Sequence, residues 1–207
     1  RPGAGPAARR TVRLRRVAGI AGDDAELFWL QLRCDAGVQR RDGSFVADGT
    51  ADGAPASTGH LAMDDTHVYW TAKTVLRRAP KDLANAADLA DFQFSSELPR
   101  GLAVDATGVY VRTDTAVFRF AKSGLQALSE PLAYLGASDT TRSEPALDDT
   151  HVYVASAAAK AVLRVPKSGG GPVETFASDS LGPIAVAVDS TFVYWTNANG
   201  ELWKRRK

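Results

Sequence analysis

The chain has 207 residues, enough for one domain or two small ones, and its 44% hydrophobic and 24% charged residues are ordinary for a globular protein. No apolar run approaches the ~20 residues of a membrane-spanning helix, and the net charge of +1 argues against a dedicated nucleic-acid binder. The single cysteine, Cys34, excludes an internal disulfide bond.

The first elements in chain order are a flexible N-terminal end, expected over residues 1–9, and a strand over residues 11–15, where apolar and basic residues alternate. From there on, a repeat of about 41 residues organises the chain. Each copy is anchored by an aromatic residue that follows a Val or Leu: Phe28, Tyr69, Tyr110, Tyr153 and Tyr194. Successive anchors are 41, 41, 43 and 41 residues apart. Five copies are too regular for chance, and the repeat covers the chain as a single domain, residues 1–207.

The pattern around each anchor is typical of short strands. Five residues before the anchor stands an aspartate in every copy: Asp23, Asp64, Asp105, Asp148 and Asp189. Seven residues before it stands an alanine: Ala21, Ala62, Ala103, Ala146 and Ala187. A basic block such as Val75-Leu76-Arg77 follows, and residues 91–95 and 173–177 then alternate with period two. The one helix candidate, residues 82–90, has a composition that also suits a loop.

Each copy therefore predicts four strands: an inner strand a (residues 61–63 and equivalents), strand b with the anchor, strand c with the basic block, and strand d with the alternating segment. Four strands in about 40 residues is the size of a propeller blade, and solenoid repeats are shorter or helical. We expect an all-β propeller. The N-terminal strand would complete the last blade beside residues 202–204 and close the ring.

Two segments carry a resemblance to known repeats. Tyr69-Trp70-Thr71-Ala72 and Tyr194-Trp195-Thr196-Asn197 resemble the YWTD propellers of the low-density lipoprotein receptor family, and residues 164–170 are similar to bacterial TolB-like and NHL-like repeats. Ala72 and Asn197 replace the aspartate of the YWTD motif. Because those relatives usually have six blades, the resemblance implies either a five-bladed ring or a six-bladed propeller that lacks one blade. It also implies an exported binding module.

The recurrent aspartates are interpreted as turn residues, since a short carboxylate accepts hydrogen bonds from backbone N–H groups just ahead of it. The alternative, a calcium site at Asp64-Asp65 or Asp148-Asp149, lacks the dense oxygen ligands that calcium needs.

His67 and His151 share one repeat position and are interpreted as turn histidines, and His60 is a lone loop residue. The sequence shows no nucleophile motif, so we expect no catalytic residue, no metal and no cofactor.

The two basic ends favour one of two interpretations: solvated edge strands, or a patch for an anionic partner. The residues of this patch would be Arg13, Arg15, Arg16, Lys204, Arg205 and Arg206.

We therefore expect a monomeric, non-catalytic module that binds a protein, a glycan or a small ligand. The alternatives are a propeller-type hydrolase or lyase with an axial site, and a sensor fragment of a larger exported protein. The first residue is Arg1, so no signal peptide is visible. An extracytoplasmic location, whether periplasmic, secreted or surface-anchored, is expected from the resemblance alone.

Overall fold

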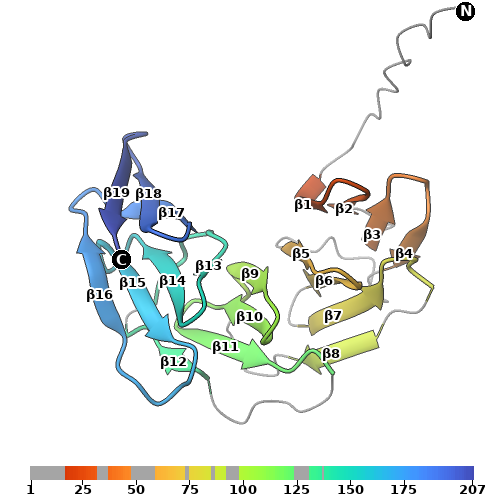
Figure 1. Ribbon diagram of the computed structural model, residues 1–207, viewed down its shortest axis with the longest axis horizontal. Coiled ribbons are helices and arrows are strands. Elements are labelled where there is room, and N and C mark those ends of the chain that lie inside the picture. The colour runs from red at the N-terminus through yellow and green to blue at the C-terminus, as the bar shows by residue number, and fades with distance from the viewer. Residues whose placement is uncertain are drawn as a thin grey trace, which may run out of the picture.

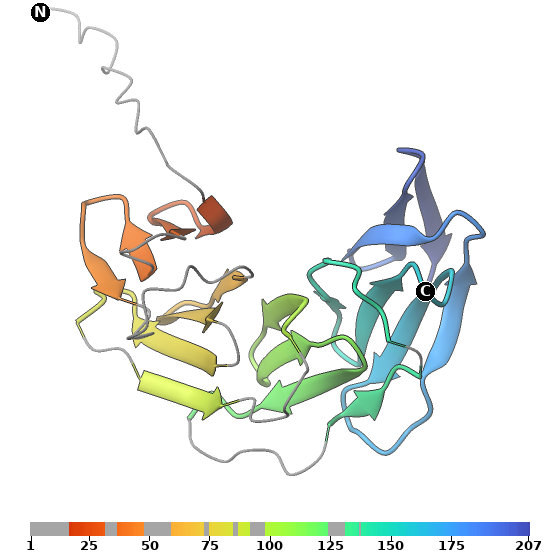
Figure 2. The same ribbon diagram turned by 180° about the vertical axis from the view of Figure 1, so that it is seen from behind.

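The computed structural model describes residues 17–31, 37–47, 59–72, 75–84, 87–91, 98–123, 131–136 and 138–207. Within them, nineteen strands form five antiparallel sheets, one for each repeat. Figures 1 and 2 show these sheets standing side by side in an arc around a central hollow. This is the blade arrangement of a β-propeller, as the repeat predicts.

The strands follow one another in the same order in every blade. The first blade contains β1 (Val17–Gly22), β2 (Leu27–Gln31), β3 (Gly37–Arg40) and β4 (Phe45–Ala47). The second contains β5 (Leu61–Met63), β6 (His67–Ala72), β7 (Val75–Pro80) and β8 (Ala87–Asp91). The third contains β9 (Gly101–Val104), β10 (Val109–Arg112), β11 (Ala116–Phe120) and β12 (Ala133–Tyr134). The fourth contains β13 (Ala146–Leu147), β14 (His151–Ser156), β15 (Ala161–Pro166) and β16 (Glu174–Ser178). The fifth contains β17 (Pro183–Val188), β18 (Phe192–Asn197) and β19 (Leu202–Arg206).

The helix considered for residues 82–90 is absent from the described part of that segment. Residues 81–82 form a turn, residue 84 lies at a bend, and β8 extends over residues 87–91. The reason is pairing: β8 adds to the edge of β7 with Asp91 opposite Val75, so the segment is held by a sheet ladder. The alternating segment at 173–177 forms β16, shifted by one residue, whereas residues 92–95 lie outside the described residues.

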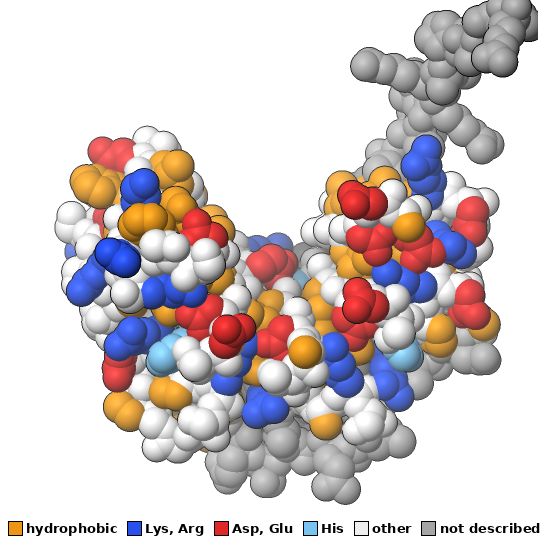
Figure 3. Space-filling view, in the orientation of Figure 1, with side chains coloured by type: hydrophobic (Ala, Val, Ile, Leu, Met, Phe, Trp, Pro, Cys, Tyr) orange, Lys and Arg blue, Asp and Glu red, His pale blue; other side chains and the backbone are white. Residues whose placement is uncertain are grey.

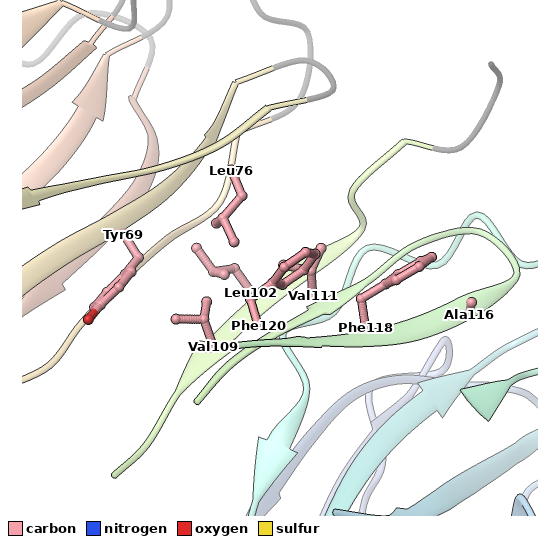
Figure 4. Packing of buried hydrophobic residues seen from close by; sticks show 8 residues of the cluster. All are labelled: Tyr69, Leu76, Leu102, Val109, Val111, Ala116, Phe118 and Phe120. Atoms are coloured by element: carbon pink, nitrogen blue, oxygen red, sulfur yellow. The ribbon is translucent and has the colours of Figure 1, made fainter. Parts of the chain in front are cut away.

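The core lies between the blades. Tyr69 and Leu76 of the second blade pack on Leu102, Val109 and Phe118 of the third. Figure 4 shows Leu76 of the second blade close to Leu102 of the third, with Tyr69 and Phe118 to either side. The same kind of cluster joins the first blade to the second, the third to the fourth and the fourth to the fifth. Burial of this apolar surface, at ~25 cal/mol per Å², is what holds successive sheets together.

The recurrent alanine is explained by the register of strands a and b. In every blade it is the residue opposite the anchor, as in Ala62 opposite Tyr69 and Ala146 opposite Tyr153. Both residues lie on the sheet face that receives the next blade. A small side chain beside a large ring leaves room for the neighbouring sheet, because packed interiors tolerate few overlaps.

The ring closure predicted from the N-terminal strand is not seen in the described residues. There β19 pairs with β18 alone, and Val17 belongs to β1, which pairs with β2 at the other end of the arc. Residues 10–16, the rest of the predicted closing strand, lie outside the described residues, as does the N-terminal end at 1–9. Figures 1 and 2 accordingly show an open arc in which the first and fifth blades do not touch.

Candidate functional site

An axial cavity lies where the inner strands of the blades meet. It has a volume of about 580 Å³. Segments of four blades line it: β1, the residues before β5, the residues before β13, and β17. Figure 3 shows the molecule hollowed between its two ends, with acidic and basic side chains around the floor of the hollow. A concave site of this size, shared by several elements, is a suitable place for a small ligand.

Two polar side chains meet at this cavity from different blades. The ring Nδ1 of His60, before β5, lies 2.7 Å from Oε1 of Glu144, before β13. The other oxygen of Glu144 accepts the backbone N–H of Leu102 in β9. Because an ionised carboxylate only accepts hydrogen bonds, His60 donates through Nδ1. Glu144 thus ties the second, third and fourth blades together at the axis.

The approach of Glu144 to the second blade depends on a glycine between them. A Cβ atom added at Gly101 would lie 2.2 Å from the carbonyl oxygen of Ser143 and 2.9 Å from Pro145 Cδ. Any other residue at position 101 would therefore displace backbone, which rarely yields at such distances. The absence of a side chain at Gly101 lets the 143–145 segment lie directly against β9.

A buried ion pair fixes the residues just before Arg142 and Glu144. Arg112, at the end of β10, lies 3.0 Å from Oδ2 of Asp139, and both side chains are buried. The same guanidinium donates to the backbone carbonyl of Thr141. Burial lowers the pKa of Arg112, although the Asp139 carboxylate favours its charged form. The Asp139 pKa stays low because hydrogen bonds from Ser156 and Thr141, together with Arg112, outweigh its burial.

The His60–Glu144 pair was missed because its members look unrelated along the chain. Both residues, however, stand nine positions before an anchor, Tyr69 for His60 and Tyr153 for Glu144. The equivalent positions in the other repeats are Gly19, Gly101 and Ala185. This position precedes or lies in the innermost strand of each blade, so polar residues there face one another across the axis. Comparing that position across the five repeats would have identified the pair.

The recurrent aspartates lie elsewhere, in the turns between strands a and b. Oδ1 of Asp64 accepts the N–H groups of Thr66 and His67, each at 2.8 Å, and Oδ2 accepts the Tyr69 hydroxyl. Asp148 repeats these contacts with Thr150, His151 and Tyr153, and Asp23, Asp105 and Asp189 accept two backbone N–H groups each. Burial and the bond to Asp148 raise the pKa of Tyr153 to about 12.

Other residues considered from the sequence have structural contacts or lie outside the described part. Nδ1 of His67 and of His151 lies 2.8 Å from the hydroxyl of the preceding threonine. Lys204, Arg205 and Arg206 lie on β19, where Arg205 donates to the carbonyl of Phe176. Arg13, Arg15, Arg16 and Cys34 are outside the described residues, so the anion patch stays a prediction.

Among the described residues, no group of three His, Cys, Asp or Glu side chains is placed to hold a metal ion. Nor does that part of the chain contain a helix long and apolar enough to cross a membrane.

No protein-family model and no curated protein matches the sequence. Solved structures do match. A chain of the nidogen/laminin complex gives a TM-score of 0.66 at 16% identity, over 92% of this chain and 75% of that one. Virginiamycin B lyase from Staphylococcus aureus gives 0.62 at 14% identity, over 92% and 69%. The extracellular domain of BT4673 from B. thetaiotaomicron gives 0.68 at 13% identity, over 97% and 28%.

The chain is a β-propeller repeat protein. The repeat, the five sheets and the structural matches agree on this, and the resemblance at residues 69–72 and 194–197 is confirmed as a likeness of fold. At sequence identities this low, the matching structures establish only the fold of this chain, because one propeller scaffold serves many unrelated functions. The function has to be argued from the cavity itself.

Proposed function

We propose that this propeller is a non-catalytic binding module whose axial cavity takes a small ligand with a carboxylate group. The observation that carries the proposal is that inner segments of four blades line one cavity of about 580 Å³. Ligand pockets of drug-sized molecules have volumes of ~300–1,000 Å³ and combine apolar walls with a few polar groups. Val17, Ala18, Ala185 and Val186 supply such walls here.

One charged side chain of the cavity, Arg142, favours an anionic group on the ligand. Both oxygens of Glu144 are engaged, one by His60 and one by the N–H of Leu102. Arg142 also lines the cavity, is exposed, and has no ion pair with any described residue. A guanidinium binds a carboxylate in a two-point geometry, which fixes orientation as well as adding affinity. Arg142 is therefore the residue that we expect to select the ligand.

Catalysis at the same cavity is the second candidate, favoured by the contact between His60 and Glu144. A carboxylate that orients an imidazole is a common arrangement for a general base. Two of the matching structures are virginiamycin B lyases, one of them an inactive His-to-Ala variant with quinupristin. Here, however, Nε2 of His60 is buried and has no hydrogen-bond partner among the described residues. A base has to reach the proton it removes, so this burial supports binding over catalysis.

The binding proposal is tested with a pair of ligands of nearly the same shape, one with a carboxylate and one with an uncharged amide. We expect phenylacetate to bind the purified chain in calorimetric titration and phenylacetamide to bind at least ten times more weakly. Arg142→Gln should remove this difference. Arg41→Gln, which changes an exposed turn arginine outside the cavity, is the matched control and should keep it. Equal binding of both compounds, or a difference that survives in Arg142→Gln, would refute the proposed ligand class.

The catalytic alternative is tested separately with quinupristin, followed by chromatography of the intact compound. The binding proposal expects no loss of quinupristin over hours. Loss that depends on protein concentration and disappears in His60→Gln would establish the lyase alternative instead. We also propose an extracytoplasmic location, supported by the match to an extracellular domain, which fractionation of the native cells would test.

A further inference from the structure

Every blade has two faces with different residues. We call the face that carries the anchor aromatic the forward face, because it packs on the next blade, and the opposite one the rear face. In the cluster between the second and third blades, Tyr69 and Leu76 come from a forward face, and Val109 and Val111 from a rear face. The other three inter-blade clusters are assembled in the same way. The structure therefore contains four copies of one interface.

An ion pair recurs in each of these interfaces. A lysine just after strand c of one blade contacts the turn aspartate of the blade before it. The pairs are Lys81 with Asp23, Lys122 with Asp64, Lys167 with Asp105, and Lys207 with Asp148. The position of these lysines is the same in all four blades. In the third blade, for example, the anchor Tyr110 pairs with Arg119, and Lys122 follows Arg119 by three residues. The pair is thus part of the repeat, as the aromatic anchor is.

The forward face of the fifth blade has the same residues without their partner. Leu202 is 70% exposed, whereas the residues at its position in the other blades, namely Val38, Leu76, Val117 and Val162, are fully buried. Tyr194 is half-buried, whereas the other four anchors are buried. No cation among the described residues lies within ion-pair distance of Asp189. The apolar and the ionic half of the interface are therefore both open on this blade.

The rear face of the first blade is partly exposed, since Trp29 on this face is buried but two apolar side chains beside it are not. Leu27 is 39% exposed, whereas the residues at its position, namely Val68, Val109, Val152 and Val193, are fully buried. Ile20, which pairs with Trp29, is exposed as well. The inner strands β1 and β17 nevertheless line the same axial cavity. The two faces therefore stand at the two ends of the open arc, on either side of the same cavity (Figures 1 and 2).

We propose that the forward face of the fifth blade is a docking surface for one further blade of the same repeat, which supplies a lysine to Asp189. The occupant must carry that lysine three residues after the partner of its anchor. In the first blade the anchor Phe28 pairs with Arg40, so the position three residues later is occupied by Gly43 and not by a lysine. A second copy of the chain, docking through its first blade, therefore lacks the required cation. The rear faces of the other four blades are already buried.

The proposal is tested by a tandem duplication in which a second copy of residues 168–207 follows Lys207. The insert provides a strand equivalent to β16 for the edge of β19, and then a copy of the fifth blade with its own lysine. We expect one cooperative melting transition, about 5–10 °C above that of the 207-residue chain. Amide hydrogens of β18 and β19 should exchange at least ten times more slowly than in the parent.

Asp189→Asn supplies the specific readout. It should lower the melting temperature of the duplicated chain by at least about 2 °C more than that of the parent, since the ion pair exists only in the former. Two separate transitions, unchanged exchange of β19, insolubility, or equal effects of Asp189→Asn in both proteins would overturn the proposal. Sedimentation of the parent is a second test: a dimer that Leu202→Glu dissociates would make a second copy the occupant and overturn the proposal as well.

Discussion

The ammonium group of Lys122, in the third blade, lies 2.8 Å from Oδ2 of Asp64, in the second blade. Oδ1 of the same carboxylate accepts two backbone N–H groups of its own turn. One side chain therefore closes the turn between strands a and b and also holds the next sheet in place. Because the arrangement recurs at three other interfaces, the turn aspartate adds an ionic contact to the apolar packing between each pair of neighbouring blades.

Replacing Asp64 with alanine should remove both contacts. A lost cap costs about 0.5–2 kcal/mol, and a partly exposed ion pair adds up to about 1 kcal/mol. We expect a loss of about 1–3 kcal/mol in the free energy of unfolding, measured by urea denaturation. Asp189→Ala is the matched control, since its turn has the same N–H contacts but no inter-blade lysine among the described residues. Equal losses for the two variants would show that Lys122 adds nothing, and a calcium-dependent melting temperature that vanishes in Asp64→Ala would overturn the turn interpretation.

These aspartates also predict how stability depends on pH. Hydrogen bonds from Lys81 and from turn N–H groups lower the pKa of Asp23 to about 2. Burial works against the charged forms of Asp64 and Asp148, but lysine and backbone hydrogen bonds outweigh it and hold both pKa values well below the usual range. A carboxyl with a lowered pKa in the folded state stabilises fully above its unfolded pKa of about 3.9 and loses that contribution as the pH falls through the folded value.

We therefore expect the free energy of unfolding to be level between pH 5 and 6 and to fall between about pH 4 and pH 2. Urea denaturation in steps of half a pH unit measures this. In Asp64→Asn the fall should be shallower, because one of the groups that bind protons on unfolding is gone. A slope that Asp64→Asn leaves unchanged would mean that other carboxyls govern acid unfolding.

The sequence was most informative where an interaction lies within one repeat. The anchor, the alanine opposite it and the turn aspartate are close along the chain, so their spacing alone predicted the strands and turns. The inter-blade lysine is equally regular, and aligning the residues after each basic block would have revealed it. The contact between His60 and Glu144 spans 84 residues and two blades. It becomes visible only once the repeats are placed around an axis.

Alternation alone does not determine whether the ring closes, for a physical reason. Alternation in residues 11–15 is compatible with a strand, but a strand's partner depends on the curvature of the arc, which the packing of large side chains between sheets sets. Trp70 and Trp195 are buried on rear faces and fill the interfaces of their blades with the blades before them, whereas Val111 and Val154 stand at this position in the third and fourth blades. The sequence shows that a residue is large, but the angle between two neighbouring sheets depends on how all the side chains of their interface pack together.

The buried pair behind the cavity gives a third prediction. Arg112→Met should lower the free energy of unfolding by about 3–5 kcal/mol, because it leaves the buried Asp139 carboxylate without its counter-charge. Arg164→Met breaks a contact of 2.6 Å with Glu174 in which both side chains are partly exposed, and should cost less than about 1 kcal/mol. Urea denaturation compares the two. A similar small loss in both variants would show that water already reaches Asp139.

Gly101 gives the last prediction, which links the packing at the axis to the candidate site. In Gly101→Ala the new methyl group would meet the Ser143 carbonyl at 2.2 Å, so the 143–145 segment has to move away from β9. Overpacking of this kind costs about 1–3 kcal/mol. The movement should also lengthen the contact between His60 and Glu144, and the imidazole signals of His60 in a ¹H–¹⁵N NMR spectrum should shift. Gly43→Ala is the control: its positive φ of 102° disfavours alanine, but nothing lies within 4 Å of the added methyl group. It should lower stability by about 1 kcal/mol and leave the His60 signals in place. His60 signals that stay unchanged in Gly101→Ala would mean that Glu144 does not depend on the close approach at Gly101.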